Sequence, residues 1–302
     1  MEARMAKTFL LVDGHNLAFR CFYGVKELSN AQGMPVHAIY GFIHSLRMLR
    51  TQLKPDVTIV CFDGGHCTKR LELAPDYKGN RAPTPDDFKV QMPYIKQAAI
   101  LSGMLCCEKK GIEADDLIGS WCTFTEEAGD KAVIAGADKD MMQCVGANVS
   151  QHIPSHHGWV SLDEQGVFEK TGVWPNQIAD FLALIGDTAD NYAGIAGVGP
   201  KTAASWLQCY GSIEGIFKNL KTLKPERFRS ILEQSHDLLR RNQALATLER
   251  RTELIQDQIP LLETLHPDTE ALEQLLYQLG LKQLARKLQD RAQPTPQQSE
   301  LF

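Results

Sequence analysis

The chain has 302 residues, 43% of them hydrophobic, which is enough for two ordinary domains with a substantial core. Its 32 Lys and Arg against 37 Asp and Glu give a formal charge of −5, so it lacks the globally basic balance of many nucleic-acid-binding proteins. No apolar run approaches the roughly 18 residues of a membrane span, and the eight cysteines include no CxxC pair. These features weigh against a membrane protein, a secreted disulfide-rich protein and a zinc finger, and they favour a cytoplasmic protein.

The first half of the chain alternates predicted strands and helices. Residues 8–13 (TFLLVD), 57–63 (VTIVCFD) and 131–136 (KAVIAG) are short apolar runs with a high β-propensity. Apolar residues recur at helical spacing over 38–53, and 115–127 is a second predicted helix. This order predicts an α/β fold, a parallel sheet with helices on both faces, whose functional site lies beyond the carboxyl ends of the strands.

Residues 64–93 interrupt this alternation. The stretch is rich in basic residues and proline, shows little periodicity and is too long for a simple connection, so we expect a functional loop. From residue 176 the chain is predicted to be helical to about residue 289, and the Pro/Gln-rich stretch 290–302 is expected to be disordered. The resulting division is an α/β core over 1–175 that includes the loop, a helical domain over 176–289, and a tail.

A glycine-rich turn, Gly197-Val198-Gly199-Pro200, separates two predicted helices, 176–185 and 201–210. The turn fails the GxxxxGK[ST] pattern of a nucleotide-binding loop, because Pro200 stands between the last glycine and Lys201 and no strand precedes it. Backbone N–H groups at a helix N-terminus can still hold a phosphate or a monovalent ion. With Lys201 and Thr202, the turn predicts sequence-independent binding of a DNA backbone, although a plain helix–helix turn fits the spacing equally well.

Acidic side chains gather at predicted strand ends, helix starts and turns. A single Asp at such a position is more often a cap or a turn residue. As a group, however, carboxylates at one edge of a sheet repel each other unless cations intervene, and Mg²⁺ or Mn²⁺ takes such oxygen ligands. Paired metals on carboxylates fit phosphoryl-transfer chemistry. The nine candidate ligands are Asp13, Asp63, Glu113, Asp115, Asp116, Asp138, Asp140, Asp187 and Asp190.

Basic and aromatic residues near the same strand ends are candidates for binding a nucleic acid. Arg20, Lys78 and Arg81 follow predicted strands, where they could neutralise a scissile phosphate. Tyr77 could stack on a terminal base, and Arg70 in the same basic stretch is a further candidate DNA contact. Taken singly, each is more often an ordinary surface residue.

Seven motifs stand out in the sequence: LVDGHNLAFR, CFDGG, DYKGNRAPTPDDF, GIEADDLIG, ADKDMMQ, DFLALIGDTADN and GIAGVGPKTA. With these motifs the sequence resembles, from about residue 9 to residue 288, the 5′-nuclease family, which includes flap endonucleases and the 5′–3′ exonuclease domain of bacterial DNA polymerase I. The resemblance implies a PIN-like parallel α/β core, a helical arch over the site and a helix-three-turn-helix domain that binds duplex DNA. Because the sequence stops before any polymerase domain, a free-standing form of the nuclease is expected.

The resemblance also implies roles for the acidic residues. They are expected to hold two Mg²⁺ or Mn²⁺ ions per active site, with Asp115 near both. One metal region is implied for Asp13, Asp63, Glu113, Asp115 and Asp116, and the second for Asp138, Asp140, Asp187 and Asp190.

Further roles are implied for the basic residues and the turn. Lys78 and Arg81 match arch-base residues that act on the scissile phosphate, so they join Asp115 and Asp138 as catalytic candidates. Tyr77 matches an aromatic residue that meets the terminal nucleotides. The turn from Gly197 to Gly199 matches a hairpin that holds the downstream duplex, usually with K⁺.

The expected function is therefore a divalent-metal-dependent 5′–3′ exonuclease and structure-specific flap endonuclease. It would act on DNA with a 5′ flap or 5′ end, in primer removal during replication or in repair, in the cytoplasm at the nucleoid. The peptide QSELF, from Gln298 to Phe302, resembles peptides that dock on the sliding clamp. Alternatives are a catalytically weak DNA-binding paralogue, a PIN-like ribonuclease, and a haloacid-dehalogenase-type phosphatase with Asp138 as its covalent nucleophile.

Overall fold

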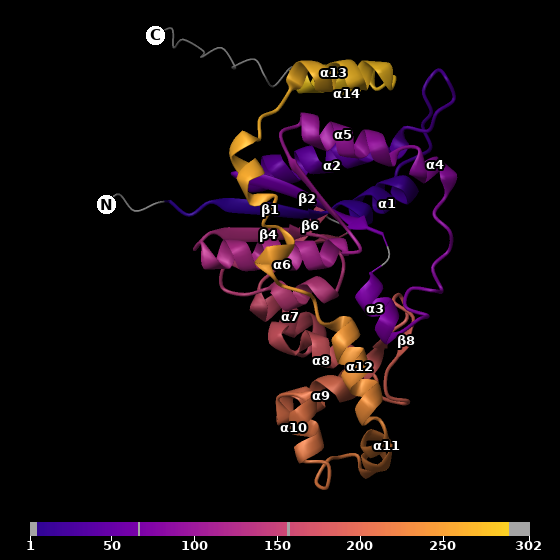
Figure 1. Cartoon of the computed structure of the whole chain (residues 1–302), viewed down its shortest axis with the longest axis vertical. Helices are drawn as coiled ribbons and strands as arrows, with labels where there is room; N and C mark the ends of the chain where they lie inside the picture. Colours follow the sequence, from indigo (N-terminus) through magenta and orange to yellow (C-terminus); the bar gives the residue numbers. More distant parts are fainter. Residues whose placement is uncertain (1–4, 66, 156–157, 290–302) are drawn as a thin grey trace, which may run out of the picture. The chain divides into compact units, whose positions relative to one another are not determined.

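The computed structural model describes residues 5–65, 67–155 and 158–289 (Figure 1). The tail over 290–302, for which disorder and a clamp-binding peptide are expected, lies outside the described residues. In the part that is described, no helix combines the length and the apolar character needed to cross a membrane. The chain divides into two compact units, which are described separately below. Of the described residues, the first unit takes those within 5–16, 55–83 and 107–260, and the second takes those within 17–54, 84–106 and 261–289.

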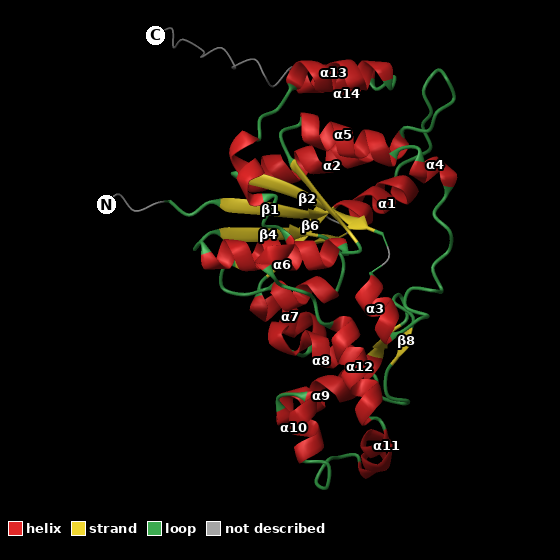
Figure 2. Cartoon of the chain, viewed as in Figure 1, coloured by secondary structure: helices red, strands yellow, loops and turns green. Residues whose placement is uncertain are grey.

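A six-stranded sheet with the order β3-β2-β1-β4-β5-β6 carries the first unit (Figure 2). The central strand β1 pairs in parallel with β2 and β4, and β4 pairs in parallel with β5. The edge strand β6 is antiparallel to β5. The prediction of a parallel sheet is thus confirmed for its centre, and the whole sheet is mostly parallel. The strands are β1 (Thr8–Asp13), β2 (Val57–Gly64), β3 (Leu105–Lys110), β4 (Lys131–Ala135), β5 (Val149–Ser155) and β6 (Gly158–Leu162).

Continuous apolar runs explain the centre of this sheet. Phe9 to Val12 of β1 are all buried, as expected for a strand that is covered on both faces. Helix α6 (Ala114–Glu127) packs against β1, β2 and β4, with Trp121 fully buried. Since β1, β2 and β4 run in the same direction, their carboxyl ends meet at one edge of the sheet.

Short helices complete the first unit around a second hydrophobic core that includes Trp206, Leu207 and Phe228. Asp180 ties three of these helices together, because its carboxylate accepts hydrogen bonds from the backbone N–H of Ile213 (2.9 Å) and from the Gln243 amide (2.5 Å). The predicted helix over 176–185 is confirmed in its main part, but its first turn is a 3₁₀ turn. The elements are α3 (Thr68–Leu73), η1 (Asp140–Cys144), α7 (Glu164–Thr171), η2 (Pro175–Gln177), α8 (Ile178–Ile185), β7 (Gly186–Asp187), β8 (Tyr192–Ala193), α9 (Pro200–Tyr210), α10 (Ile213–Lys218), η3 (Glu226–Phe228), α11 (Arg229–Gln234), α12 (His236–Ala246) and η4 (Thr252–Leu254).

The second unit is helical. Helix α2 packs on α5, α5 packs on α13, and α13 packs on α14. Phe88 stacks on Phe19, with ring centroids 4.0 Å apart, and meets Phe22 edge to face. The buried Gln91 side chain accepts a hydrogen bond (2.8 Å) from the backbone N–H of Ala38, which satisfies a free donor at the start of α2. The elements that lie in or enter this unit are α1 (Gly14–Gly24), α2 (His37–Leu53), α4 (Asp86–Lys89), α5 (Met92–Leu101), η5 (Ile259–Thr264), α13 (Thr269–Gln278) and α14 (Lys282–Gln289).

Candidate active site

Five of the nine candidate acids lie where β1 and β2 end and α6 begins. Asp13 is the last residue of β1, and Asp63 lies one residue before the end of β2. The Asp63 carboxylate accepts a hydrogen bond (2.9 Å) from the backbone N–H of Ala114, the first residue of α6. It therefore joins the end of a strand to a helix N-terminus, where the helix dipole favours negative charge. The same helix start carries Glu113, Asp115 and Asp116.

The other four acids follow β4 or lie on the β7–β8 hairpin. Asp138 and Asp140 come after β4, and the Asp138 carboxylate accepts a hydrogen bond (3.0 Å) from the Asp140 backbone N–H. Asp187 closes β7, and Asp190 lies in the turn before β8. Carboxylate oxygens of Asp140, Asp187 and Asp190 all lie within 4.8 Å of one another, and all three residues are buried.

Burial and mutual repulsion link both groups of acids. Burial raises the pKa of Asp13 from 3.8 to about 7, against a lowering by a backbone hydrogen bond, and the charges of Asp63 and Asp138 raise it further. Burial likewise raises the pKa of Asp140 well above its usual value, with added repulsion from Asp138 and Asp115. Each of these acids therefore feels carboxylates from the other group, so the acids form a single electrostatic cluster rather than separate surface patches.

Arg70, from α3, is the most deeply buried cation of this cluster. Its guanidinium binds Glu113 and forms two hydrogen bonds, of 3.0 and 2.9 Å, with the Asp116 carboxylate. It also donates to the backbone carbonyl of Leu245, and only 4% of the residue is exposed. In this arrangement the side chain compensates buried acids, and the contact of Arg70 with DNA stays a prediction. Only the tertiary fold brings α3 to the start of α6, so the sequence offers no signal for this pairing.

Three further cations contact the acids singly. The Nζ atom of Lys78 lies 2.6 Å from a carboxylate oxygen of Glu113, and the Arg81 guanidinium lies 2.8 Å from Asp190. The Nζ atom of Lys139 lies 3.0 Å from the carboxylate that closes β7. Lys139 is not among the residues predicted from the sequence. Its position between two acids in ADKD is the signal that could have indicated a cation in the acidic site.

Tyr77 is also buried in the cluster. Its hydroxyl donates a hydrogen bond (2.7 Å) to the Asp190 carboxylate, and its ring packs with Tyr192 and Leu245. Only 6% of the residue is exposed, so the ring is not offered to a terminal base in this arrangement. The polar and apolar parts of the side chain both have partners within the protein, and the stacking role of Tyr77 stays a prediction.

The loop that carries Lys78 is hydrogen-bonded to the β7–β8 hairpin. The Lys78 backbone N–H donates to the Asp190 carbonyl (3.1 Å). The Asn80 amide donates to the carbonyl of Thr188 (2.7 Å), and the Asn191 amide donates back to the loop at a carbonyl one residue before Tyr77 (2.7 Å). Lys78 adopts φ of 55°, a left-handed conformation that is rare for a lysine. These bonds hold the cationic loop against the acidic hairpin, and the two asparagines are site residues that sequence reasoning does not identify.

Gln151 is another supporting residue outside the predicted set. It lies on β5, is fully buried, and donates hydrogen bonds to the carbonyls of Gly136 (3.0 Å) and Asp138 (2.7 Å). These bonds fix the backbone just where two of the acids leave β4. A glutamine in a predicted strand is a weak sequence signal for this role, because glutamine is also common in strands at the exposed edge of a sheet.

The predicted phosphate-binding turn lies between β8 and α9. Gly197 has φ of 78°, a conformation that favours glycine, and Gly199 precedes the first turn of α9. The side chain of Val198 is buried in the helical core, while Lys201 is exposed and Thr202 half-exposed. The turn thus presents backbone and a cation at an exposed helix start. Arg20 lies on α1 in the second unit and is exposed; it stays a predicted DNA contact.

The set Asp140, Asp187 and Asp190 fits a hard divalent cation. The Oδ1 atom of Asp140 is buried and has no hydrogen-bond partner among the described residues. Carboxylate oxygens are the ligands that Mg²⁺ and Mn²⁺ prefer. Among the described residues, nine carboxylates of the cluster face four lysine and arginine side chains, so five negative charges are unbalanced when every acid is ionised. Such an excess attracts further cations.

Glu113 and Asp116 differ from this set. Their carboxylates lie within 4.8 Å of each other and of the Cys67 thiol, but the Arg70 guanidinium already binds both. A cation at this position would have to share these two acids with Arg70. Of the other three acids of the predicted first region, Asp115 also lies close to Arg70, with a carboxylate oxygen 3.6 Å from the guanidinium, and the Asp63 carboxylate lies 3.5 Å from the His15 imidazole.

Comparisons with known families match most of the chain. A family model described as the N-terminal resolvase-like domain of 5′-3′ exonuclease matches residues 8–172, and one described as the C-terminal SAM fold of 5′-3′ exonuclease matches residues 173–270. The 5′-3′ exonuclease of Aquifex aeolicus is 36% identical over 285 residues, which cover 93% of this chain and 95% of that protein. The thermostable DNA polymerase I of Thermus aquaticus is 37% identical over 297 residues, but this chain spans only 35% of its length.

Solved structures show the same fold. A structure of T5 5′-exonuclease with bound divalent metal ions (zinc) has a TM-score of 0.68 and 22% identity, covering 89% of this chain and 99% of that chain. Flap endonuclease-1 from Methanococcus jannaschii has a TM-score of 0.60 and 15% identity, covering 94% and 92% of the two chains. The overall architecture, an α/β core followed by a helical part, is shared with both.

Proposed function

The chain belongs to the 5′–3′ exonuclease family, and on this basis we propose that it hydrolyses DNA phosphodiester bonds as a 5′–3′ exonuclease and flap endonuclease with two divalent cations. The observation that carries the proposal is the buried carboxylate cluster with its excess of negative charge, including three acids whose oxygens lie within 4.8 Å of one another. The relatives are named 5′-3′ exonuclease or DNA polymerase I, and a fold neighbour is named flap endonuclease-1.

Mg²⁺ or Mn²⁺ is the proposed metal, because the candidate ligands are carboxylates. Asp138, Asp140, Asp187 and Asp190 would hold one ion. Asp13, Asp63 and Asp115 would hold the other, and Glu113 and Asp116 would contribute in competition with Arg70. When bound, the ions would neutralise charge on the phosphodiester and activate the attacking water.

Lys78 and Arg81 are the residues that we assign to the scissile phosphate. Both lie at the edge of the acidic cluster, with 20% and 53% of their side chains exposed, so each can exchange a carboxylate partner for a phosphate oxygen. The hydrogen bonds between the loop of Lys78 and the β7–β8 hairpin hold these two cations at a fixed distance from Asp190. Their role is to orient the phosphate and to stabilise the charge that develops on it.

The helical part of the first unit is the proposed site for duplex DNA. Support comes from the exposed turn at Gly197 and Gly199, which leads into α9 with Lys201 and Thr202 at its first turn. Backbone contacts of this kind fix the register of a protein on DNA without reading its sequence. The same proposal includes a K⁺ ion, which the backbone of Gly197 and Gly199 would hold and which would supply positive charge for a DNA phosphate.

The decisive experiment is cleavage of a 5′-labelled DNA flap in the presence of Mg²⁺, Mn²⁺ or EDTA. We expect cleavage with either metal and none in EDTA, with Asp140→Asn lowering the rate about 100-fold or more. Glu127→Gln, which alters an exposed acid at the end of α6, is the matched control and is expected to cleave normally. Flap binding without metal-dependent cleavage would instead identify a catalytically weak DNA-binding paralogue, and faster cleavage of an RNA flap would favour a ribonuclease.

Sequence alone supports two further parts of the proposal. We assign QSELF, from Gln298 to Phe302, to docking on the sliding clamp, and the cellular site to the cytoplasm at the nucleoid, in primer removal or repair. Deleting residues 298–302 is expected to abolish binding to a purified clamp and to leave cleavage of free flap DNA unchanged. Clamp binding by the truncated chain would refute the assignment.

A further inference from the structure

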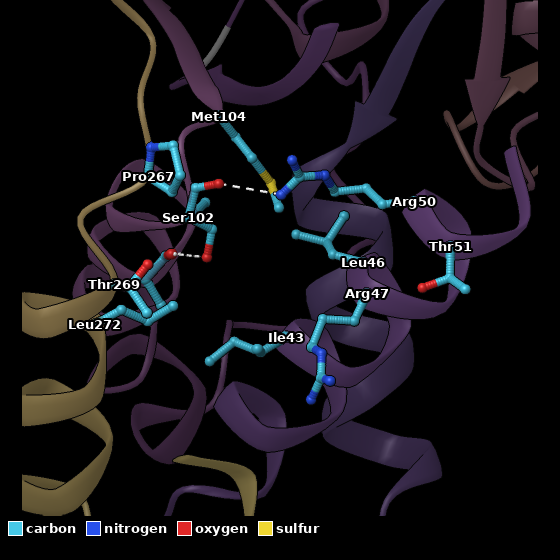
Figure 3. A pocket seen from close by; sticks show the side chains of 12 residues that line it. Ile43, Leu46, Arg47, Arg50, Thr51, Ser102, Met104, Pro267, Thr269 and Leu272 are labelled. Carbon is cyan, nitrogen blue, oxygen red and sulfur yellow. Dashed lines mark hydrogen bonds between the residues drawn. The ribbon is translucent and has the colours of Figure 1, made fainter. Parts of the chain in front are cut away.

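The second compact unit contains a cavity of about 470 Å³ between α2, α5 and the start of α13 (Figure 3). Its wall is largely apolar and includes Ile43 and Leu46 of α2, Met104 after α5, and Leu272 of α13. These four side chains are buried. The volume falls within the range of about 300–1,000 Å³ that small-molecule sites occupy. None of the nine acids of the candidate active site lines it.

Arg50 is one of two arginines that line this cavity. Its guanidinium extends across the apolar wall toward Met104 and donates one hydrogen bond (3.1 Å) to the carbonyl of Ser102 (Figure 3). Within residues 5–65, 67–155 and 158–289, no carboxylate lies within ion-pair distance of it. Burial lowers the pKa of Arg50, with no opposing acid to raise it.

A half-buried guanidinium without an acidic partner is costly, because desolvation is not repaid by an ion pair. One carbonyl acceptor leaves most of its five N–H donors available. Arg47 also lines the cavity, and it donates to the carbonyl of Lys287 (2.9 Å). The hydroxyl-bearing residues at the rim, Thr51 and Thr269, add polar groups near the opening. The site therefore combines an apolar wall with one cation that lacks a counter-ion.

We propose that this cavity binds a small organic anion, a molecule with an apolar body and a single carboxylate or phosphate group that pairs with Arg50. The apolar body would cover Ile43, Leu46 and Leu272, and the anionic group would receive the free guanidinium N–H donors. A nucleic-acid backbone does not fit, since it needs a row of cations over an open surface rather than an apolar hollow. The proposal is independent of the nuclease chemistry.

The test uses the full chain and two fluorescent probes of similar shape. The anionic probe is 8-anilinonaphthalene-1-sulfonate, and the neutral one is N-phenyl-1-naphthylamine. We expect the anionic probe to bind with one-to-one stoichiometry and Arg50→Met to weaken it by about tenfold or more, while the neutral probe changes by less than about twofold. Arg286→Met, which removes an exposed arginine of α14 outside the cavity, is the matched control and is expected to change neither.

A second variant blocks the cavity itself. Thr269 is exposed at the rim, so Thr269→Trp is expected to fold and to weaken both probes by tenfold. Octanoate and octyl phosphate are then compared as displacers of the anionic probe, which separates the two sources of anion. Displacement by either supports the proposal. The proposal is overturned if the anionic probe does not bind one to one, if it binds wild type and Arg50→Met equally, or if neither displacer competes with it. Circular dichroism and thermal unfolding verify that each variant is folded.

Discussion

Replacing Arg70 by methionine tests the interpretation of the acidic cluster most directly. The guanidinium is almost completely buried and is bound to Glu113 and Asp116, so its removal leaves two carboxylates without their strongest partner. Methionine fills the space of the aliphatic part of the arginine side chain, which limits the loss of packing. Breaking a buried ion pair in this way costs about 3–5 kcal/mol. We expect the free energy of unfolding in EDTA at pH 7.5 to fall by this amount.

The loss has a definite pH dependence. Burial acts to raise the pKa of Glu113, but the charges of Lys78 and Arg70 hold this pKa below its usual 4.5. A carboxyl with a lowered pKa in the folded state adds stability above its unfolded pKa, and this stability is lost as the pH falls. Without Arg70 the folded-state pKa values of Glu113 and Asp116 move upward, since burial is then less opposed. The difference between wild type and variant is therefore greatest near neutral pH and shrinks toward pH 4–5.

Urea unfolding between pH 5 and pH 8, with EDTA and then with Mn²⁺, measures these effects. Saturating Mn²⁺ at about 100 times its dissociation constant adds about 2.7 kcal/mol and is expected to restore part of the loss. Lys69→Met is the matched control: the neighbouring Lys69 pairs with Glu249 at the surface, and such a pair contributes at most about 1 kcal/mol. A loss below 1 kcal/mol for Arg70→Met, or one independent of pH, would refute the reasoning.

Three further predictions concern single residues. In EDTA, Asp140→Asn is expected to be about 1–2 kcal/mol more stable than wild type in urea unfolding, because it removes a buried carboxylate that other acids repel; a clear loss of stability would contradict this. Lys201→Ala is expected to weaken duplex binding and to lower the slope of log K against log salt by about one unit, measured by fluorescence anisotropy; an unchanged slope would remove Lys201 from the interface. Burial raises the pKa of Asp180, so the ionised carboxylate opposes folding, and stability is lost as the pH rises through the folded-state pKa. The stability of Asp180→Asn relative to wild type is therefore expected to increase from pH 4 to pH 7. A difference that does not change with pH would contradict this.

The central strands were predictable because their sequences are continuous apolar runs. The runs at 8–13, 57–63 and 131–136 agree within one residue with β1, β2 and β4. Strands β3 and β5 lack such a pattern: β3 reads LCCEKK, and β5 buries the polar Gln151, which is tolerated only because its amide bonds two backbone carbonyls. A pattern in a single sequence cannot show that a buried glutamine amide will find these hydrogen-bond partners.

The acids of the candidate site were predictable from their positions at strand ends, since parallel strands bring those ends together. The buried side chains that pair with these acids could not be predicted in the same way. Arg70 and Tyr77 stand in a basic stretch that suggests an exposed surface, yet both are buried by contacts with residues more than thirty positions away. Which cations turn inward depends on where α3 meets the start of α6, and this is a property of the tertiary fold alone.

The bonds between the loop of Lys78 and the β7–β8 hairpin bear on recombination among related sequences. Asn80 and Asn191 each donate to a backbone carbonyl of the other segment, so each bond needs the asparagine on one segment and the matching backbone conformation on the other. A chimera that takes one segment from a parent without its asparagine would lose one of these two bonds between the lysine loop and the acidic hairpin, although the acceptor carbonyl is still present. Residues 76–81 and 187–191 should therefore come from the same parent in a chimera, although more than a hundred positions separate them.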